Sequence, residues 1–395
     1  MTIAAAAFLM VTMGVRQSLG LFVSPLNSAT GLGVASISFA LAIAQFTWGA
    51  AQPVAGALAD RHGPGKVLAG GVLLLSAGLA ITPFMRSSLG LVASLGLLLA
   101  IGSGAASFSV LIGAAAKRLP ADARGKAAGM VNAGGSLGQF VFAPIAQALI
   151  QGFGWMVAFW ALAAAVLAAL PLVRAVAPRD AAAHSPQAAA GSPWRALGDA
   201  FGDRSYVLLN LGFFTCGFHI AFLVTHLPQE VNLCGLPPTV ASWSLAIIGL
   251  ANIAGSLAAG FSTARWRSKY ILALMYGSRA ALIAAYLVAP KTALTFYLFA
   301  AGLGATWLAT MPPTAAIVGK LFGVRFLATL FGMTLLSHQI GGFLGAWLGG
   351  IAYERSGSYQ WMWYADMVLA AAAAIVNLPI REARIEPQIV SSQPA

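Results

Sequence analysis

The run Gly14-Val15-Arg16-Gln17-Ser18-Leu19-Gly20-Leu21-Phe22-Val23-Ser24-Pro25 lies inside an apolar stretch that extends from Ile3 to Leu26. A charged side chain near the centre of a bilayer costs about 3 kcal/mol on insertion scales, so an arginine at this depth indicates a functional group. A related run begins 203 residues later. In it, Gly217, His219 and Pro228 stand at the places of the glycine, the arginine and the proline of the first run. Two stretches therefore place such a group at the same depth of an apolar helix.

Composition indicates a membrane protein. Of the 395 residues, 59% are hydrophobic and only 8% are charged, whereas a soluble domain carries about 25% charged residues. The apolar runs are about 20 residues long and do not alternate, which favours helices over a transmembrane barrel. The 44 glycines suit closely packed helices in lipid.

We predict an all-α, multi-pass membrane protein with twelve spans, at residues 3–27, 35–59, 66–86, 89–117, 125–150, 155–175, 205–229, 238–262, 269–290, 293–319, 326–352 and 358–380. The long polar interruption after the sixth span has linker composition and ends in a short amphipathic piece at residues 194–201. The predicted organisation is a first six-helix bundle (1–175), a linker (176–203), a second six-helix bundle (204–381) and a tail (382–395).

Basic residues gather in alternate loops. Of the 22 Lys and Arg residues, 17 lie on the side that carries both termini and the linker, so the positive-inside rule makes that side cytoplasmic. The expected location is a bacterial inner membrane. The net charge of +12 is accounted for by these loops, and no stretch has the pattern of a nucleic-acid-binding helix.

The repeat at a spacing of 203 extends beyond the opening run. Lys66 matches Lys269, and the glycines at 129, 138 and 154 match those at 332, 341 and 357. A constant offset across separate segments indicates that six spans were duplicated in parallel, giving two pseudo-symmetric bundles around a central site.

The loop after the second span reads Gly56-Ala57-Leu58-Ala59-Asp60-Arg61-His62-Gly63-Pro64-Gly65-Lys66. It resembles the cytoplasmic signature of the major facilitator superfamily, over a chain whose span number also fits. The resemblance implies the fold of that family and a conformational latch formed by Asp60, Arg61 and Lys66. The second copy, residues 260–265, keeps a basic residue but lacks the Asp.

Within the superfamily, Arg16-Gln17-Ser18 is similar to the first helix of the monocarboxylate and oxalate–formate branch, where a basic residue stands at this place. The resemblance implies transport of a small organic anion. The eighth span departs from that branch, because it has Asn252 and Ser256 where an arginine is usual. Oxalate-transporting members carry a lysine in the eleventh span, where this chain has His338.

The charges inside the spans favour an anion site. Of the ten acidic residues, only Asp366 lies well within a span, whereas Arg16, Arg279, His219 and His338 all do. An excess of buried positive charge needs a partner, which a substrate anion would supply. Arginine suits a carboxylate because its planar fork donates two parallel hydrogen bonds. The peripheral Arg279 is expected to form a structural ion pair with Asp366.

The remaining polar residues in the spans complete the predicted site. The predicted substrate-binding set is Arg16, Gln17, Asn132, Gln139, His219, Asn252, His338 and Gln339. The histidines His219 and His338 are also the candidates for proton coupling, since imidazole titrates near neutral pH, although His219 is equally compatible with a hydrogen-bonded core histidine.

The sequence therefore predicts a secondary active transporter that moves a small organic anion, with a monocarboxylate favoured, by alternating access, coupled to protons or by exchange. Two alternatives remain open: an efflux pump for amphipathic toxic compounds and a membrane sensor without transport. No phosphate-binding loop, nucleophile elbow or zinc-binding helix is present, and two cysteines give no disulfide framework or metal spacing. We expect no enzyme activity, no cofactor, no metal and a monomer in the lipid bilayer.

Overall fold

The computed structural model describes residues 1–395 except 117–120, 178–192, 264, 324–326 and 383–395. It is entirely helical in the described part. Ten of the described helical stretches are long and apolar enough to cross a membrane. Two more, α17 (Leu327–Ser356) and α18 (Gln360–Asn377), have 30 and 18 residues. At 1.5 Å per residue the shorter one is about 27 Å long, close to the thickness of a bilayer core.

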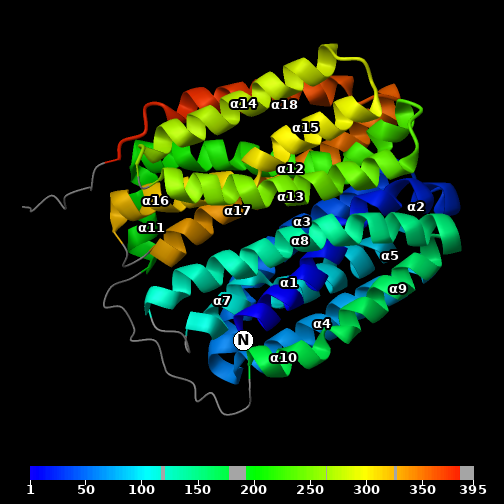
Figure 1. Ribbon diagram of the computed structural model, residues 1–395, viewed down its shortest axis with the longest axis horizontal. Coiled ribbons are helices and arrows are strands. Elements are labelled where there is room, and N and C mark those ends of the chain that lie inside the picture. Colours follow the sequence, from blue (N-terminus) through cyan, green and yellow to red (C-terminus); the bar gives the residue numbers. More distant parts are fainter. Residues whose placement is uncertain (117–120, 178–192, 264, 324–326, 383–395) are drawn as a thin grey trace, which may run out of the picture.

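The helices form two groups that lie against each other (Figure 1). The first group contains α1 (Thr2–Gln17), η1 (Leu19–Phe22), α2 (Val23–Thr30), α3 (Val34–His62), α4 (Pro64–Ile81), η2 (Thr82–Phe84), α5 (Ser88–Leu91), η3 (Val92–Leu99), α6 (Ala100–Ala105), α7 (Phe108–Ala116), α8 (Ala121–Phe153), α9 (Trp155–Ala168) and α10 (Leu170–Val176). The second group contains α11 (Pro193–Gly202), α12 (Arg204–Leu233), α13 (Pro238–Ser262), α14 (Ser268–Val288), α15 (Ala293–Thr306), η4 (Leu308–Thr310), α16 (Met311–Phe322), α17 and α18.

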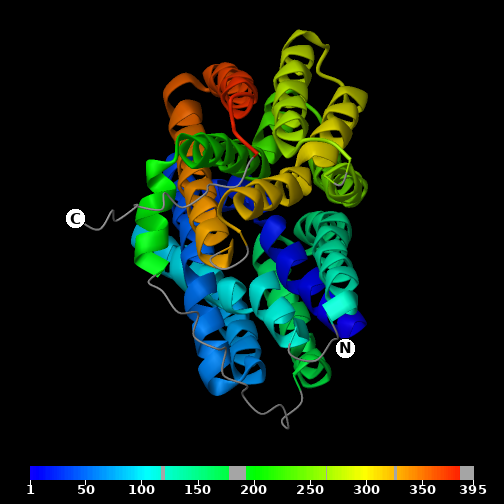
Figure 2. The ribbon, with the colours of Figure 1, turned by 90° about the vertical axis from the view of Figure 1, so that its left-hand side faces the viewer.

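The two ends of the molecule are distinguished by the chain connections. We call the end where α10 finishes and α12 begins the linker end, which is on the left of Figure 1 with α11, α16 and α7. Figure 2 looks onto that end. At the opposite end, α2 finishes at Thr30, α3 begins at Val34 and α17 finishes at Ser356. Successive spans therefore alternate in direction, as the twelve predicted spans require.

The repeat predicted from the sequence is visible in the packing. In the first group α1 packs on α8, where Gly14 lies directly against the backbone of Gly138. In the second group α12 packs on α17, and the equivalent glycines, Gly217 and Gly341, lie against the backbones of His338 and Phe214. Equivalent glycines therefore hold equivalent helix pairs in the two groups, because only a missing side chain lets two backbones approach so closely.

Two helices contain breaks at the depth where polar residues gather. The first span changes from α-helix to a 3₁₀ turn after Gln17 and resumes as α2. The tenth span is interrupted after Thr306, and α16 restarts with Pro312 and Pro313 in its first turn, where the missing N–H groups are tolerated. Such breaks expose backbone polar groups that side chains must satisfy inside a membrane.

The two groups meet along two main seams, and Gly20 of η1 also lies against the backbone of Val224 of α12. In the first, α3 packs on α17: the Ala35 N–H donates to Glu354 Oε1 (3.1 Å) at the opposite end, and the Phe39 ring packs on the Trp347 ring at 5.5 Å. In the second, α8 packs on α13 near Ser136 and Asn252. Nearer the linker end, Gly56 of α3 faces open space, because no described atom lies within 4 Å of the place where a Cβ would stand. The contacts described above thus lie between mid-helix and the opposite end.

Candidate functional site

Arg16 is the cation of the candidate site and stands one residue before the end of α1. Its side chain is half-buried. Its Nη2 atom donates a hydrogen bond to Gln45 Oε1 on α3, and its guanidinium carbon lies 3.9 Å from the ring centre of Trp48. A cation over an indole face is stabilised by about 0.5–2 kcal/mol. Arg16 is therefore held by two neutral groups, an amide oxygen and an aromatic face.

Gln45 continues the arrangement across the seam between the two groups. Its Nε2 atom donates to Gln339 Oε1 on α17 at 2.9 Å. Gln339 is buried, and its side chain fills the space above Gly49 of α3. Arg16, Gln45 and Gln339 thus form one hydrogen-bonded chain from α1 through α3 to α17.

Asn252 occupies the second seam. Its Nδ2 atom donates to Ser136 Oγ of α8 at 2.9 Å, and its Oδ1 atom accepts from the Leu308 N–H at 2.9 Å. The Leu308 N–H is freed by the break after α15, so Asn252 satisfies a backbone donor that would otherwise be unpaired in an apolar environment. Asn252 therefore links the broken tenth span to the other group of helices.

His219 lies against Asp366 of α18, and the two residues form a buried ion pair or hydrogen bond through Nδ1 and Oδ2. The exposed fractions are 2% and 0%. His219 Nε2 and Asp366 Oδ1 have no hydrogen-bond partner in the described part. No described contact joins His219 to the Arg16 cluster, so the structure places it with α18 inside the second group.

The predicted ion pair between Arg279 and Asp366 is wrong. Arg279 is 1% exposed, and its guanidinium donates instead to the carbonyl oxygens of Thr306 and Trp307 and to Cys216 Sγ. Those carbonyls lie where α15 ends, and the carbonyl end of a helix attracts cations. Arg279 therefore stabilises the break in the tenth span, and Asp366 is taken by His219.

The other predicted site residues fall into different surroundings. His338 is buried with its ring centre 5.0 Å from that of Phe213, and its Nδ1 has no described partner. Gln139 is buried on α8 and its Nε2 likewise has none among the described residues. Gln17 and Asn132 are half-buried, and no hydrogen bond from either side chain occurs in the described part.

The latch predicted at the linker end is not tested by the described residues. Arg61 and Lys66 are exposed at the junction between α3 and α4. The side chain of Asp60 lies outside the described residues, as do the basic residues Lys117 and Arg118. The latch of Asp60, Arg61 and Lys66 therefore stays a prediction.

Charges outside the spans are tied together at the linker end of the second group. Glu382 accepts hydrogen bonds from the Lys269 N–H and the Lys320 ammonium, each at 2.7 Å. Burial opposes ionisation of Glu382, but these donors prevail and hold the pKa of its carboxyl below the ordinary value. Asp203, the N-cap of α12, likewise pairs with Arg381 at 2.7 Å.

Sequence reasoning missed Gln45, Trp48 and Ser136. Gln45 had a visible signal, since it is a polar amide in the middle of the apolar span 35–59. Trp48 and Ser136 gave none, because tryptophan and serine are common in lipid-facing and packed helices. Only the arrangement of α1, α3, α8 and α13 brings them to the site.

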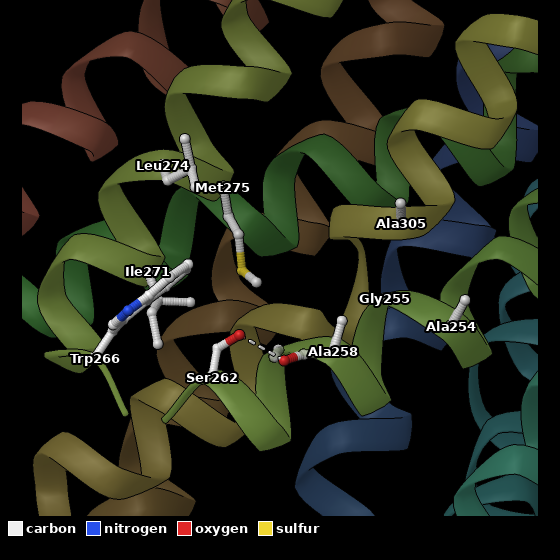
Figure 3. A pocket seen from close by; sticks show the side chains of 10 residues that line it. Ala254, Gly255, Ala258, Ser262, Trp266, Ile271, Leu274, Met275 and Ala305 are labelled. Atoms are coloured by element: carbon white, nitrogen blue, oxygen red, sulfur yellow. Dashed lines mark hydrogen bonds between the residues drawn. The ribbon is translucent and has the colours of Figure 1, made fainter. Parts of the chain in front are cut away.

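A hollow of about 340 Å³ lies away from these residues, between α13, α14 and α15 (Figure 3). Its wall is mostly apolar and includes Ala258, Trp266, Leu274 and Met275. None of the predicted site residues lines it. It therefore offers no charged side chain to an anionic ligand, unlike the cluster around Arg16.

Comparison with solved structures shows the fold. The chain is similar to a D-xylose–proton symporter with a TM-score of 0.76 and 16% identity, covering 96% of this chain and 98% of the symporter. It is also similar to a bacterial homologue of the human lysosomal transporter Spinster with a TM-score of 0.71 and 15% identity, covering 95% and 93% of the two chains.

Comparison with sequences identifies the family. Monocarboxylate transporter 13 of Rattus norvegicus is 25% identical over 93% of this chain and 86% of its own length. Monocarboxylate transporter 11 of Mus musculus is 27% identical over 95% and 87%. An uncharacterized MFS-type transporter of Bacillus subtilis is 22% identical over 92% and 90%. Since the family model described as Major Facilitator Superfamily matches residues 4–309 and 234–393, the chain belongs to this superfamily of multi-pass membrane transporters.

Proposed function

We propose that this secondary transporter carries a small organic anion, with a monocarboxylate as the favoured class, and that Arg16 binds the carboxylate. The observation that carries the proposal is the half-buried guanidinium of Arg16 between two neutral groups, Gln45 and Trp48. Within the described part, no carboxylate lies within ion-pair distance of it. A carboxylate ligand would supply the missing charge through two parallel hydrogen bonds.

The relatives support the same substrate class. Two of them are named monocarboxylate transporters, and each aligns with more than nine-tenths of this chain. The depth of Arg16 also fits, since transporter sites of this kind lie near the bilayer midplane where the two halves meet. From the predicted binding set we propose Arg16 and Gln339 as the central pair, and we add Gln45 and Trp48 because they contact Arg16.

Alternating access would follow from rocking residues 1–175 against residues 204–381. The hydrogen bond from the Ala35 N–H to Glu354 joins the two groups at the end opposite the linker, and we infer that this end is closed. If the basic loops are cytoplasmic, as the positive-inside rule indicates, this conformation is closed to the outside. The latch at Asp60, Arg61 and Lys66 would act in the opposite conformation, when the linker ends come together.

Proton coupling, rather than exchange, would need a titratable group in the spans. His219 with its partner Asp366, and His338, are the candidates. Both histidines are buried and each has a ring nitrogen without a described partner. Gain or loss of a proton by either imidazole would change the charge inside the second group of helices by one unit.

Uptake into proteoliposomes tests the function. The purified chain is reconstituted and supplied with labelled pyruvate, oxalate or a lipophilic cation, with and without an inward proton gradient. The proposal predicts uptake of pyruvate that unlabelled monocarboxylates compete away. Transport of the cation with no uptake of either acid would contradict it and favour the efflux alternative, and no transport of any probe would favour the sensor.

A further inference from the structure

Gln45 joins two parts of the molecule that a transporter must coordinate. On one side its Oε1 accepts a hydrogen bond from Arg16, and on the other its Nε2 donates to Gln339 at 2.9 Å. Its side chain also packs against Gly342, where an added Cβ would lie 2.9 Å from Gln45 Cγ. One amide therefore touches both the proposed anion-binding group and the opposite group of helices.

The amide oxygen of Gln45 occupies a position that a ligand needs. It is the hydrogen-bond acceptor that the described structure gives the Arg16 guanidinium. A bound carboxylate would offer Arg16 two charged oxygens, which make stronger hydrogen bonds than one neutral amide. The anion would thus displace Gln45 from Arg16, since both compete for the same donors.

Displacement of Gln45 would be felt at the seam between α3 and α17. That seam contains, in order from the middle to the opposite end, the pair Gln45–Gln339, the packing of Ala42 with Ala346, and the hydrogen bond from Ala35 to Glu354. The Gln45–Gln339 hydrogen bond is the polar contact at the mid-helix end of this seam. A Gln45 side chain that leaves Arg16 loses the contact that orients its amide toward Gln339.

We propose that Gln45 is a positioning residue that acts as an internal substitute for the substrate: it holds Arg16 when the site is empty and loosens the α3–α17 seam when an anion takes its place. The inference rests on the proposed function, because it assigns to Gln45 the link between anion binding at Arg16 and the movement of the two bundles. A structural amide that only packs α3 on α17 would not respond to the ligand.

Four versions of the full chain test the inference: wild type, Gln45→Glu, Gln45→Met and Gln52→Glu. Gln45→Glu gives Arg16 a permanent carboxylate, so stabilisation of the protein by pyruvate should disappear. Gln45→Met removes the competitor without adding charge, so the pyruvate Kd should fall several-fold while the uptake rate also falls. Gln52→Glu adds the same charge to the same helix and should match wild type in both.

A second readout does not depend on the ligand. Spin labels at Ser28 and Ser356, which lie at the ends of α2 and α17, report the distance across the closed end in a Cys234→Ser background. Without pyruvate, Gln45→Glu should shift the distances to longer values than in wild type and Gln52→Glu. Unchanged distances, or unchanged pyruvate binding in both Gln45 variants, would overturn the inference. If pyruvate fails to bind wild type, the proposed function fails, and the label distances still decide the role of Gln45.

Discussion

Replacing His219 by phenylalanine removes the partner of a carboxylate that has no exposed surface. Asp366 is 0% exposed, and its Oδ1 has no hydrogen-bond partner in the described part even when the histidine is present. Breaking a buried ion pair from one side costs about 3–5 kcal/mol, because the remaining charge stays buried without compensation. We expect about 4 kcal/mol of lost stability for His219→Phe, since only the surrounding helices remain to solvate the carboxylate.

The double variant His219→Phe/Asp366→Leu distinguishes the pair from its surroundings. Replacing both partners by apolar groups removes the stranded charge, and such replacements are often neutral or stabilising. Stability should therefore recover to within about 1 kcal/mol of wild type, measured by chemical unfolding of the purified protein in mixed micelles. Loss of less than about 1 kcal/mol in His219→Phe, or additive losses in the double variant, would refute the buried pair.

Three further changes test the packing and the loop charges. Asn252→Ala should cost about 1–3 kcal/mol in thermal unfolding because the Leu308 N–H loses its acceptor; full stability would contradict this role. Gly217→Ala should cost about 1–3 kcal/mol because the new methyl group would overlap the His338 carbonyl oxygen, whereas Gly70→Ala, which meets no atom within 4 Å, should be neutral or stabilising. Glu382→Gln should cost about 1 kcal/mol at pH 7. Because the folded pKa of Glu382 is lowered, wild type should lose that contribution only as the pH falls below about 4, and a loss on raising the pH would contradict the assignment.

The architecture could be predicted because its signals are local and repeated. Each apolar run is long enough to span a bilayer, and polar loops separate the runs, so the helices follow from length and hydropathy. The offset of 203 residues matched Gly14 with Gly217 and Gly138 with Gly341, and these glycines hold the same helix pairs in both groups. The duplicated bundle therefore followed from the sequence. The exact start of the break in the tenth span is harder to predict, because Pro312 and Pro313 stand several residues after Thr306.

The site could be predicted only where a residue type is rare in a membrane. Arg16 was found because an arginine in an apolar run is unusual, and Gln339 because glycine packing does not explain an amide. Partners were harder, since hydrogen bonds between distant helices depend on rotation and register. Arg279 was expected to pair with Asp366 by charge, but the carbonyls at the break in the tenth span satisfy it instead.

The same reasoning explains why His219 was ambiguous. Its match to Arg16 in the repeat suggested a shared role, yet the second group contains a carboxylate at position 366 that the first group lacks. The equivalent of Asp366 at the spacing of 203 is Ala163, which is buried in α9. Asp366 thus pairs with His219 inside the second group of helices. Arg16 instead contacts Gln45, which reaches across the seam to α17.

Thermal stability of the purified protein with small monocarboxylates, measured for wild type, Arg16→Gln and Arg86→Gln, tests the central claim most directly. Arg86 is an exposed loop arginine, so its variant controls for loss of one positive charge. A ligand at about 100 times its Kd stabilises by about 2.7 kcal/mol. The account predicts this stabilisation in wild type and Arg86→Gln and its loss in Arg16→Gln. Equal stabilisation of all three proteins would contradict an anion site at Arg16.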